Sequence, residues 1–115
     1  MSFLVAIGSA HGFYKSEPKL DLQRLSDIRK STDACLVLHG GSGISAPTLR
    51  EAIQKGICKI NLATEVKNAF MKSIASEVNK SQEIDLRIVF PPAIQAVKNL
   101  VTGKLDIIKE GRVEL

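Results

Sequence analysis

Aromatic residues are scarce in this sequence, and its charges are mixed. The 115 residues include no tryptophan, one tyrosine and four phenylalanines, and sixteen basic residues are interleaved with twelve acidic ones. A nucleic-acid interface normally shows a basic stripe or an aromatic stacking platform, and neither is visible. We therefore expect no nucleic-acid partner, and we interpret the net charge of +4 as a solvated surface that helps to attract small anions.

The apolar runs are also too short to cross a membrane, which needs about 20 consecutive apolar residues. The segment FLVAI near the start is short and lacks the basic region of a signal peptide. Only two cysteines are present, Cys35 and Cys58, and they form no CxxC pair. These observations predict a cytoplasmic protein with no membrane partner and with two buried free thiols.

What the sequence does contain is a recurring apolar run that ends in small or polar residues. The three runs are FLVAIGSAHG, CLVLHGG and CKINLAT. Near-continuous apolar runs of this length are typical of parallel strands that are buried on both faces. With 44% hydrophobic and 24% charged residues, the chain has the composition of one globular domain.

Helical patterns separate and follow these runs. Ser45 is a suitable N-cap, Gly56 is a suitable stop, and Thr64 is a second candidate N-cap. The connection between residues 81 and 89 is the least regular part of the chain. The predicted helices cover Leu20 to Lys30, Ser45 to Lys55, Thr64 to Val78, and a terminal helix that opens at Pro91 and Pro92.

The resulting order, β-α-β-α-β-α plus a terminal helix, predicts an α/β fold with a parallel sheet. The sheet could be open and doubly wound, or it could belong to a barrel. A (β/α)8 barrel typically needs about 250 residues. In the second case the chain therefore supplies about three of the eight strands.

The two histidines of the chain occupy equivalent places, each at a predicted strand end and each followed by glycine. Ligands bind at the carboxyl ends of the strands in parallel α/β folds. A single histidine is more often structural, but His11 and His39 at matching strand ends favour a shared site. Two neutral imidazoles could bind zinc, although a catalytic zinc usually has three protein ligands.

The GGSG segment that follows His39 can present backbone N–H groups to an anion, as loops before helices do when they bind phosphate. Asn61 and Thr64 follow the next strand and could complete the same cradle. GGSG alone is a weak signal, because it could simply form a tight turn while Thr64 simply caps a helix. The HGG triplet could also suggest a hydrolase oxyanion loop, but the chain has no GxSxG nucleophile elbow.

Several blocks of the sequence, in order, carry a resemblance to a known family. They read VAIGSAHGFYKSEPKLD, LVLHGGSGIS and GICKINLATEVKNAF, and DLRIVFPPAIQAVKNLV follows them. From about Val5 to Leu105 the chain resembles the class II, metal-dependent ketose-bisphosphate aldolases. Within this family the chain looks most similar to the tagatose-bisphosphate branch, with the fructose-bisphosphate branch nearby. The paired AHG and HGGSG blocks and the NxAT segment make this resemblance specific.

The resemblance implies a zinc ion, with a monovalent cation as a further candidate. It also implies reversible aldol cleavage of a ketose 1,6-bisphosphate into dihydroxyacetone phosphate and glyceraldehyde 3-phosphate. In such enzymes zinc polarises the ketone so that a proton can leave the adjacent carbon. His11 and His39 match zinc-binding positions. The positions that match the dihydroxyacetone phosphate site are Gly12, Gly40, Gly41, Ser42, Asn61, Leu62, Ala63 and Thr64.

The chain also departs from the family pattern. The family enzyme is a complete (β/α)8 barrel, and residues 1–115 resemble only its C-terminal two-fifths, as one incomplete domain that lacks the upstream strands. The family's catalytic aspartate and its remaining zinc histidine form an Asp-His pair, which this sequence does not contain. We therefore expect the isolated chain to lack aldolase activity.

Open sheet edges and an uncovered inner face predict a homo-oligomer, or a companion aldolase chain that supplies the missing strands. Three hypotheses remain: part of a working zinc aldolase, an inactive truncated remnant, and a non-catalytic partner subunit of an aldolase. The start MSFLVAIG enters a strand directly, which favours truncation. Tagatose and fructose remain alternative sugars, because the residues that contact the distal half of the substrate belong to the upstream part of the family enzyme.

Overall fold

The structure, a computed structural model, describes residues 1–10, 12 and 14–112. Its centre is a three-stranded parallel sheet in the order β1 (Ser2–Leu4), β2 (Cys35–Leu38), β3 (Ile57–Ile60). The central strand pairs Leu36 with Phe3 on one side and with Ile57 on the other. The predicted α/β class with a parallel sheet is confirmed, although β1 is shorter than the predicted run.

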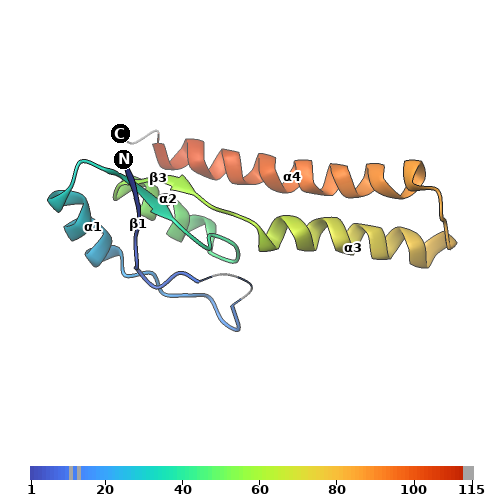
Figure 1. The fold of residues 1–115 in the computed structure, drawn as a ribbon, viewed down its shortest axis with the longest axis horizontal. Coiled ribbons are helices and arrows are strands. Elements are labelled where there is room, and N and C mark those ends of the chain that lie inside the picture. Colours follow the sequence, from blue (N-terminus) through green and yellow to red (C-terminus); the bar gives the residue numbers. More distant parts are fainter. Residues whose placement is uncertain (11, 13, 113–115) are drawn as a thin grey trace.

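In the described part of the chain, four helices surround and extend this sheet (Figure 1). α1 (Leu22–Ser31) and α2 (Ala46–Gln54) connect the strands. α3 (Thr64–Ser81) and α4 (Leu86–Arg112) form a long antiparallel hairpin that projects away from the sheet, so the chain is 55 Å long in its longest dimension. The last turns of α4 return to the sheet end of the molecule, where they pack against α2.

The core lies between the sheet and the two connecting helices. Leu36 and Leu38 of β2 are fully buried, together with Leu25 of α1. The outer strand β1 is less covered, since Phe3 and Leu4 are 47% and 61% exposed. The prediction that each apolar run forms a strand buried on both faces is therefore correct for β2 and only partly correct for β1 and β3.

The starts of α1 and α2 follow from side-chain caps. Asp21 accepts from the N–H of Arg24 at 2.9 Å before α1, and Ser45 accepts from the N–H of Thr48 at 3.4 Å before α2. Gly56, with a φ of +116°, follows the end of α2 and allows the chain to turn into β3. The predicted cap at Ser45 and the predicted stop at Gly56 are confirmed.

The prediction that Thr64 caps α3 is wrong. Ala63 occupies the N-cap position without a side-chain cap, and Thr64 is the first helical residue. The N–H of Glu65 donates instead to Oγ of Ser42 at 3.3 Å, so a loop distant in sequence satisfies this helix end. Gln82, with a φ of 50°, ends α3 later than predicted.

The start of α4 also corrects the prediction, because the helix begins at Leu86 and contains Pro91 and Pro92. Asp85 gives the reason: its carboxylate accepts the N–H of Arg87 at 2.9 Å, and its carbonyl accepts the next helical N–H groups. This cap outweighs the preference of proline for a first turn. The guanidinium of Arg87 binds the same carboxylate and holds the pKa of Asp85 below its usual range.

The two cysteines are free, as predicted, but the prediction that both are buried is wrong. Cys35 is half-buried on β2, and Cys58 is exposed on the edge strand β3. A hydrogen bond between the two thiols raises the pKa of Cys35, and partial burial raises it further. Among the described helices, none is long and apolar enough to cross a membrane.

Candidate functional site

The carboxyl ends of β2 and β3 meet the loop after β1 at a small cavity of about 70 Å³. Its walls contain most of the residues that the sequence indicated as a phosphate and metal site. Gly41 lies behind these walls, against Ile60 and Leu62. His11 lies outside the described residues. The lining residues are Gly12, His39, Gly40, Ser42, Asn61, Leu62, Ala63 and Thr64.

Each of the three glycines in the loop after β2 stands where another residue would be strained. Gly40 and Gly43 have φ values of +66° and +79°, in the left-handed region that favours glycine. Gly41 lies so close to β3 that a Cβ there would be 2.5 Å from Cγ2 of Ile60. The shape of this loop therefore depends on all three glycines.

Asn61 connects His39 to the glycine loop. Its backbone continues the pairing of β2 with β3, because its N–H donates to the carbonyl of Leu38 at 2.9 Å and its carbonyl accepts the N–H of Gly41 at 3.0 Å. Its side-chain Nδ2 lies 3.2 Å from Nδ1 of His39. With the Asn61 amide in this orientation its nitrogen donates and Nδ1 accepts, an arrangement that requires the tautomer of His39 with its proton on Nε2.

This arrangement bears on metal binding. A metal ligand must offer a lone pair, and the Nδ1 lone pair of His39 is engaged by Asn61. Rotation of the Asn61 amide by half a turn would present its oxygen, place the proton on Nδ1 and free the lone pair of Nε2. Residues 1–10, 12 and 14–112 contain no group of three or more His, Cys, Asp or Glu placed to hold a metal ion. These residues therefore do not by themselves form a zinc site.

Tyr14 ties the loop after β1 to the glycine loop. Its hydroxyl accepts the N–H of Ala10 at 2.7 Å, and it lies 2.8 Å from the carbonyl oxygen of Ala10 and 3.0 Å from that of Gly40. With one hydrogen, it donates to one of these two carbonyls at a time. Its ring also fills the space beside Gly43, where Cδ2 is 3.2 Å from the position of a Cβ. Tyr14 was not among the predicted site residues, because no local sequence pattern indicates this contact.

Two of the amides expected to hold phosphate are already used. The N–H of Gly41 donates to the backbone carbonyl that follows β3, and the N–H of Gly43 donates to Oε1 of Glu65 at 2.5 Å. Within the described part of the chain, the N–H groups of Gly40 and Ser42 have no such partner, and both residues line the cavity. These two amides are therefore the candidate donors of the loop for an anion in the cavity.

The start of α3 adds electrostatic support to the cavity. Ala63 and Thr64 line the cavity at the first turn of this 18-residue helix. A helix N-terminus carries partial positive charge and has N–H groups without partners inside the helix. The cavity therefore combines two kinds of donor that suit an anion, loop amides and a helix start.

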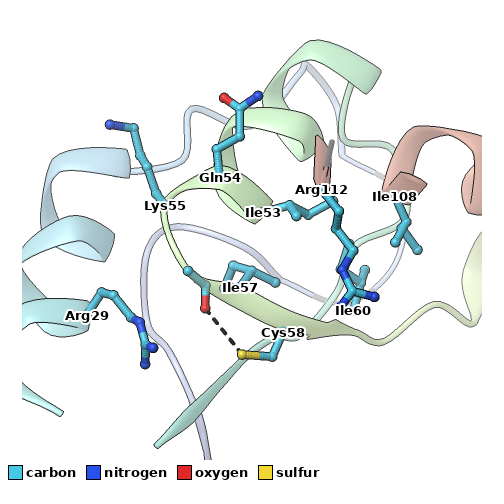
Figure 2. A pocket seen from close by; sticks show the side chains of 10 residues that line it. Arg29, Ile53, Gln54, Lys55, Ile57, Cys58, Ile60, Ile108 and Arg112 are labelled. Atoms are coloured by element: carbon cyan, nitrogen blue, oxygen red, sulfur yellow. Dashed lines mark hydrogen bonds between the residues drawn. The ribbon is translucent and has the colours of Figure 1, made fainter. Parts of the chain in front are cut away.

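A larger cavity of about 390 Å³ lies along β3, from Ile57 at its amino end to Ile60 (Figure 2). Arg29, Lys55 and Arg112 line it together with Ile57 and Cys58 of the strand. None of the predicted site residues that the structure describes lines this larger cavity. Because parallel α/β folds place their ligands at the carboxyl ends of strands, the smaller cavity is the better candidate.

Two charged residues that the sequence analysis did not identify lie beside the glycine loop. Glu65 accepts the N–H of Gly43, and Lys104 of α4 forms an ion pair with Glu65 at 2.9 Å. The position of Glu65 directly after Thr64 was the only available sequence signal. Lys104 follows 39 positions later, so no local pattern could have related it to the site.

Comparison with known proteins gives consistent results. Residues 2–111 match the protein family described as class-II fructose-bisphosphate aldolase. The chain is similar to the YdjI aldolase from Escherichia coli K12, with 32% identity and a TM-score of 0.78 over 96% of this chain and 40% of that one.

Two further solved structures show the fold alone. A putative fructose-1,6-biphosphate aldolase from Coccidioides immitis is 24% identical with a TM-score of 0.84, over 96% of this chain and 39% of that one. A fructose-bisphosphate aldolase from Campylobacter jejuni is 17% identical with a TM-score of 0.73, over 95% of this chain and 40% of that one. The chain thus spans about two-fifths of the length of these structures. The three parallel strands and four helices of the described residues confirm the predicted fold class, part of a (β/α)8 barrel.

Proposed function

The chain belongs to the class-II fructose-bisphosphate aldolase family, and on this basis we propose that it carries the part of an aldolase site that binds dihydroxyacetone phosphate. The complete reaction is the reversible cleavage of a ketose 1,6-bisphosphate into dihydroxyacetone phosphate and glyceraldehyde 3-phosphate. Tagatose and fructose bisphosphates are the substrates that we propose, with the sequence blocks favouring the tagatose branch. Residues 1–115 then form the C-terminal portion of one barrel domain.

The observation that carries this proposal is the meeting of three strand ends at one cavity. Gly12 follows β1, Gly40 and Ser42 follow β2, and residues 61–64 follow β3. Unpaired backbone N–H groups and a helix N-terminus offer partial positive charge without a bulky side chain. A phosphate group fits this combination better than a neutral ligand does.

The residues of the cavity bind and orient the phosphate end of the substrate. The N–H groups of Gly40 and Ser42 donate to phosphate oxygens, and Thr64 adds its hydroxyl at the start of α3. Asn61 holds the imidazole of His39 in a fixed orientation beside them. Binding the phosphate fixes the position of the substrate ketone relative to His39, and this orientation is the contribution of the chain to the reaction.

Members of the family are generally zinc-dependent, and His11 and His39 are the zinc ligands that we propose, with a monovalent cation as a second ion. The described residues alone do not form a zinc site, and the sequence contains no Asp-His pair that could supply the acid/base aspartate and a third histidine. The isolated chain is therefore a binding module of an aldehyde-lyase and does not catalyse aldol cleavage by itself.

The exposed edges of the sheet support the proposal that another chain completes the barrel. Phe3 and Leu4 expose apolar side chains on β1, and Cys58 and Lys59 are exposed on β3. Such edges pair readily with further strands. A second copy of the chain or a companion aldolase chain in the cytoplasm is the partner that we propose. The same edges also support the alternative function, a non-catalytic subunit or an inactive remnant of an aldolase.

Calorimetric titration with dihydroxyacetone phosphate tests the proposed binding. Thr64→Val removes a hydroxyl from the cavity at nearly constant volume, and Thr102→Val removes one from an exposed position on α4 as a matched control. We expect unchanged affinity for Thr102→Val and about tenfold weaker binding for Thr64→Val, or about 1.4 kcal/mol. Equal affinities for the two variants, or no binding by the wild-type chain, would contradict the proposal.

Activity is tested separately. A sensitive aldol-cleavage assay on the purified chain, with and without added zinc, should detect no turnover. Zinc-dependent turnover by the chain alone would contradict its proposed role as a binding module.

A further inference from the structure

We propose that Glu65 and Lys104 are positioning residues that hold the glycine loop in its phosphate-binding shape and keep the charge beside it neutral. This inference rests on the proposed function, because it concerns the same loop. Neither residue lines the cavity. Both act through two residues of the glycine loop: Ser42, which lines the cavity, and Gly43, which follows it in the sequence.

Glu65 is bonded to the loop in two directions. Its carboxylate Oε1 accepts the N–H of Gly43 at 2.5 Å, and its own N–H donates to Oγ of Ser42 at 3.3 Å. The first bond joins a side chain of α3 to the loop backbone, and the second joins the helix backbone to a loop side chain. Together they fix the loop against the start of α3, so that the N–H of Ser42 keeps its position at the cavity.

Lys104 holds this carboxylate from the other helix of the hairpin. Its Nζ lies 2.9 Å from Oε2 and 3.2 Å from Oε1 of Glu65. Both side chains are only 16% exposed, less than either partner of any other ion pair in the described part of the chain. Removal of one partner from such a shielded pair leaves the other charge uncompensated, which is more costly than breaking a surface pair.

The charge of the pair explains why Lys104 is needed beside an anion site. A lone carboxylate bonded to Gly43 would place a negative charge next to the amides that receive phosphate, and like charges at such distances repel strongly where water is partly excluded. The ammonium of Lys104 offsets this charge. The carboxylate can then fix the loop without weakening the binding of an anion.

The two residues therefore have opposite expected effects on binding. Glu65→Gln keeps an oxygen that can accept the N–H of Gly43, removes the negative charge and leaves Lys104 positive. Lys104→Met keeps the carboxylate and removes the charge that offsets it. Phosphate affinity should stay equal or rise in the first variant and fall in the second. If the pair contributed only to the stability of the fold, phosphate affinity would fall in both variants.

Two measurements on the full chain test this inference. The first is the hydrogen-exchange rate of the Gly43 amide by NMR, which needs no ligand, and the second is the dissociation constant for inorganic phosphate. Lys104→Met should speed Gly43 exchange and weaken phosphate binding, each about tenfold. Lys104→Arg should restore both to within about threefold. Lys109→Met, at an exposed position on the same helix, should change neither.

Unchanged Gly43 exchange in folded Lys104→Met would overturn the inference, and so would weaker phosphate binding by Glu65→Gln. If Lys104→Met does not fold, Glu65→Gln and Lys104→Arg still decide the question, because both keep the shape of the pair. A wild-type chain that does not bind phosphate would overturn the proposed function. Gly43 exchange would then still show whether the pair holds the loop.

Discussion

Replacement of Gly41 by alanine measures how closely the glycine loop packs against β3. A Cβ at this position would lie 2.5 Å from Cγ2 of Ile60 and 3.2 Å from Cδ2 of Leu62. The first distance is shorter than real contacts allow, and Ile60 is a β-branched residue on a strand, so its methyl group has little freedom to move. Forcing an extra carbon into such a contact costs about 1–3 kcal/mol.

A second effect acts in the opposite direction. Gly41 does not have a positive φ, so alanine can adopt its conformation. An alanine also loses less backbone entropy on folding than a glycine, which raises the free energy of unfolding by about 0.4–1 kcal/mol. We therefore expect Gly41→Ala to lower the free energy of unfolding by about 1–2 kcal/mol. Urea unfolding followed by circular dichroism measures this quantity.

Gly103 provides the matched control. It lies inside α4, and a Cβ there would meet no atom within 4 Å. Gly103→Ala should therefore raise the free energy of unfolding by about 0.5–1 kcal/mol, because glycine weakens a helix interior. The cost of Gly41→Ala should also shrink when Ile60 is shortened to alanine. A Gly41→Ala variant as stable as the wild type, with Gly103→Ala behaving as expected, would refute the proposed close packing.

Three further predictions concern other parts of the chain. Tyr14→Phe removes the hydroxyl that joins two loops of the site, and it should lower the free energy of unfolding by about 1 kcal/mol in urea titrations; no change would exclude a role in holding the site. The pKa of Asp85 is lowered by Arg87, so this carboxylate contributes stability that is present above its unfolded pKa and lost as the pH falls through its lower folded value. Acid unfolding of Arg87→Gln should therefore depend less on pH than that of the wild type between about pH 5 and pH 2, and identical pH profiles would contradict this. The pKa of Cys35 is raised mainly by its hydrogen bond with Cys58, so Cys58→Ala should speed alkylation of Cys35 by iodoacetamide at pH 8, as followed by mass spectrometry; slower or unchanged alkylation would argue against the thiol contact.

The sequence predicted the arrangement of strands and helices because their signals are local. Apolar runs indicate buried strands, Ser45 indicates a helix start, and Gly56 indicates a stop. The approach of residues 39–43 to residues 61–64 then follows from topology, since the carboxyl ends of neighbouring parallel strands lie at the same edge of a sheet. The binding roles of these residues remain predictions.

The features that the sequence did not reveal depend on contacts between distant segments. Lys104 reaches Glu65 only because α4 folds back along α3, and no spacing rule relates residues 39 positions apart. The start of α4 was predicted at Pro91 because proline favours a first turn, while the cap at Asp85 set it earlier. Local preferences of this kind fail where another cap or a tertiary contact satisfies the helix end more favourably.

We propose that dihydroxyacetone phosphate binds at the carboxyl ends of the strands. Titration of the ¹⁵N-labelled chain with dihydroxyacetone phosphate, followed by the shifts of its backbone amide signals, tests this binding site. We expect saturable shifts that are largest at Gly40, Ser42 and Thr64, and none at Gly56, which lines the larger cavity just before the amino end of β3. Shifts centred on Gly56, or no saturable shifts at the glycine loop, would contradict this proposal.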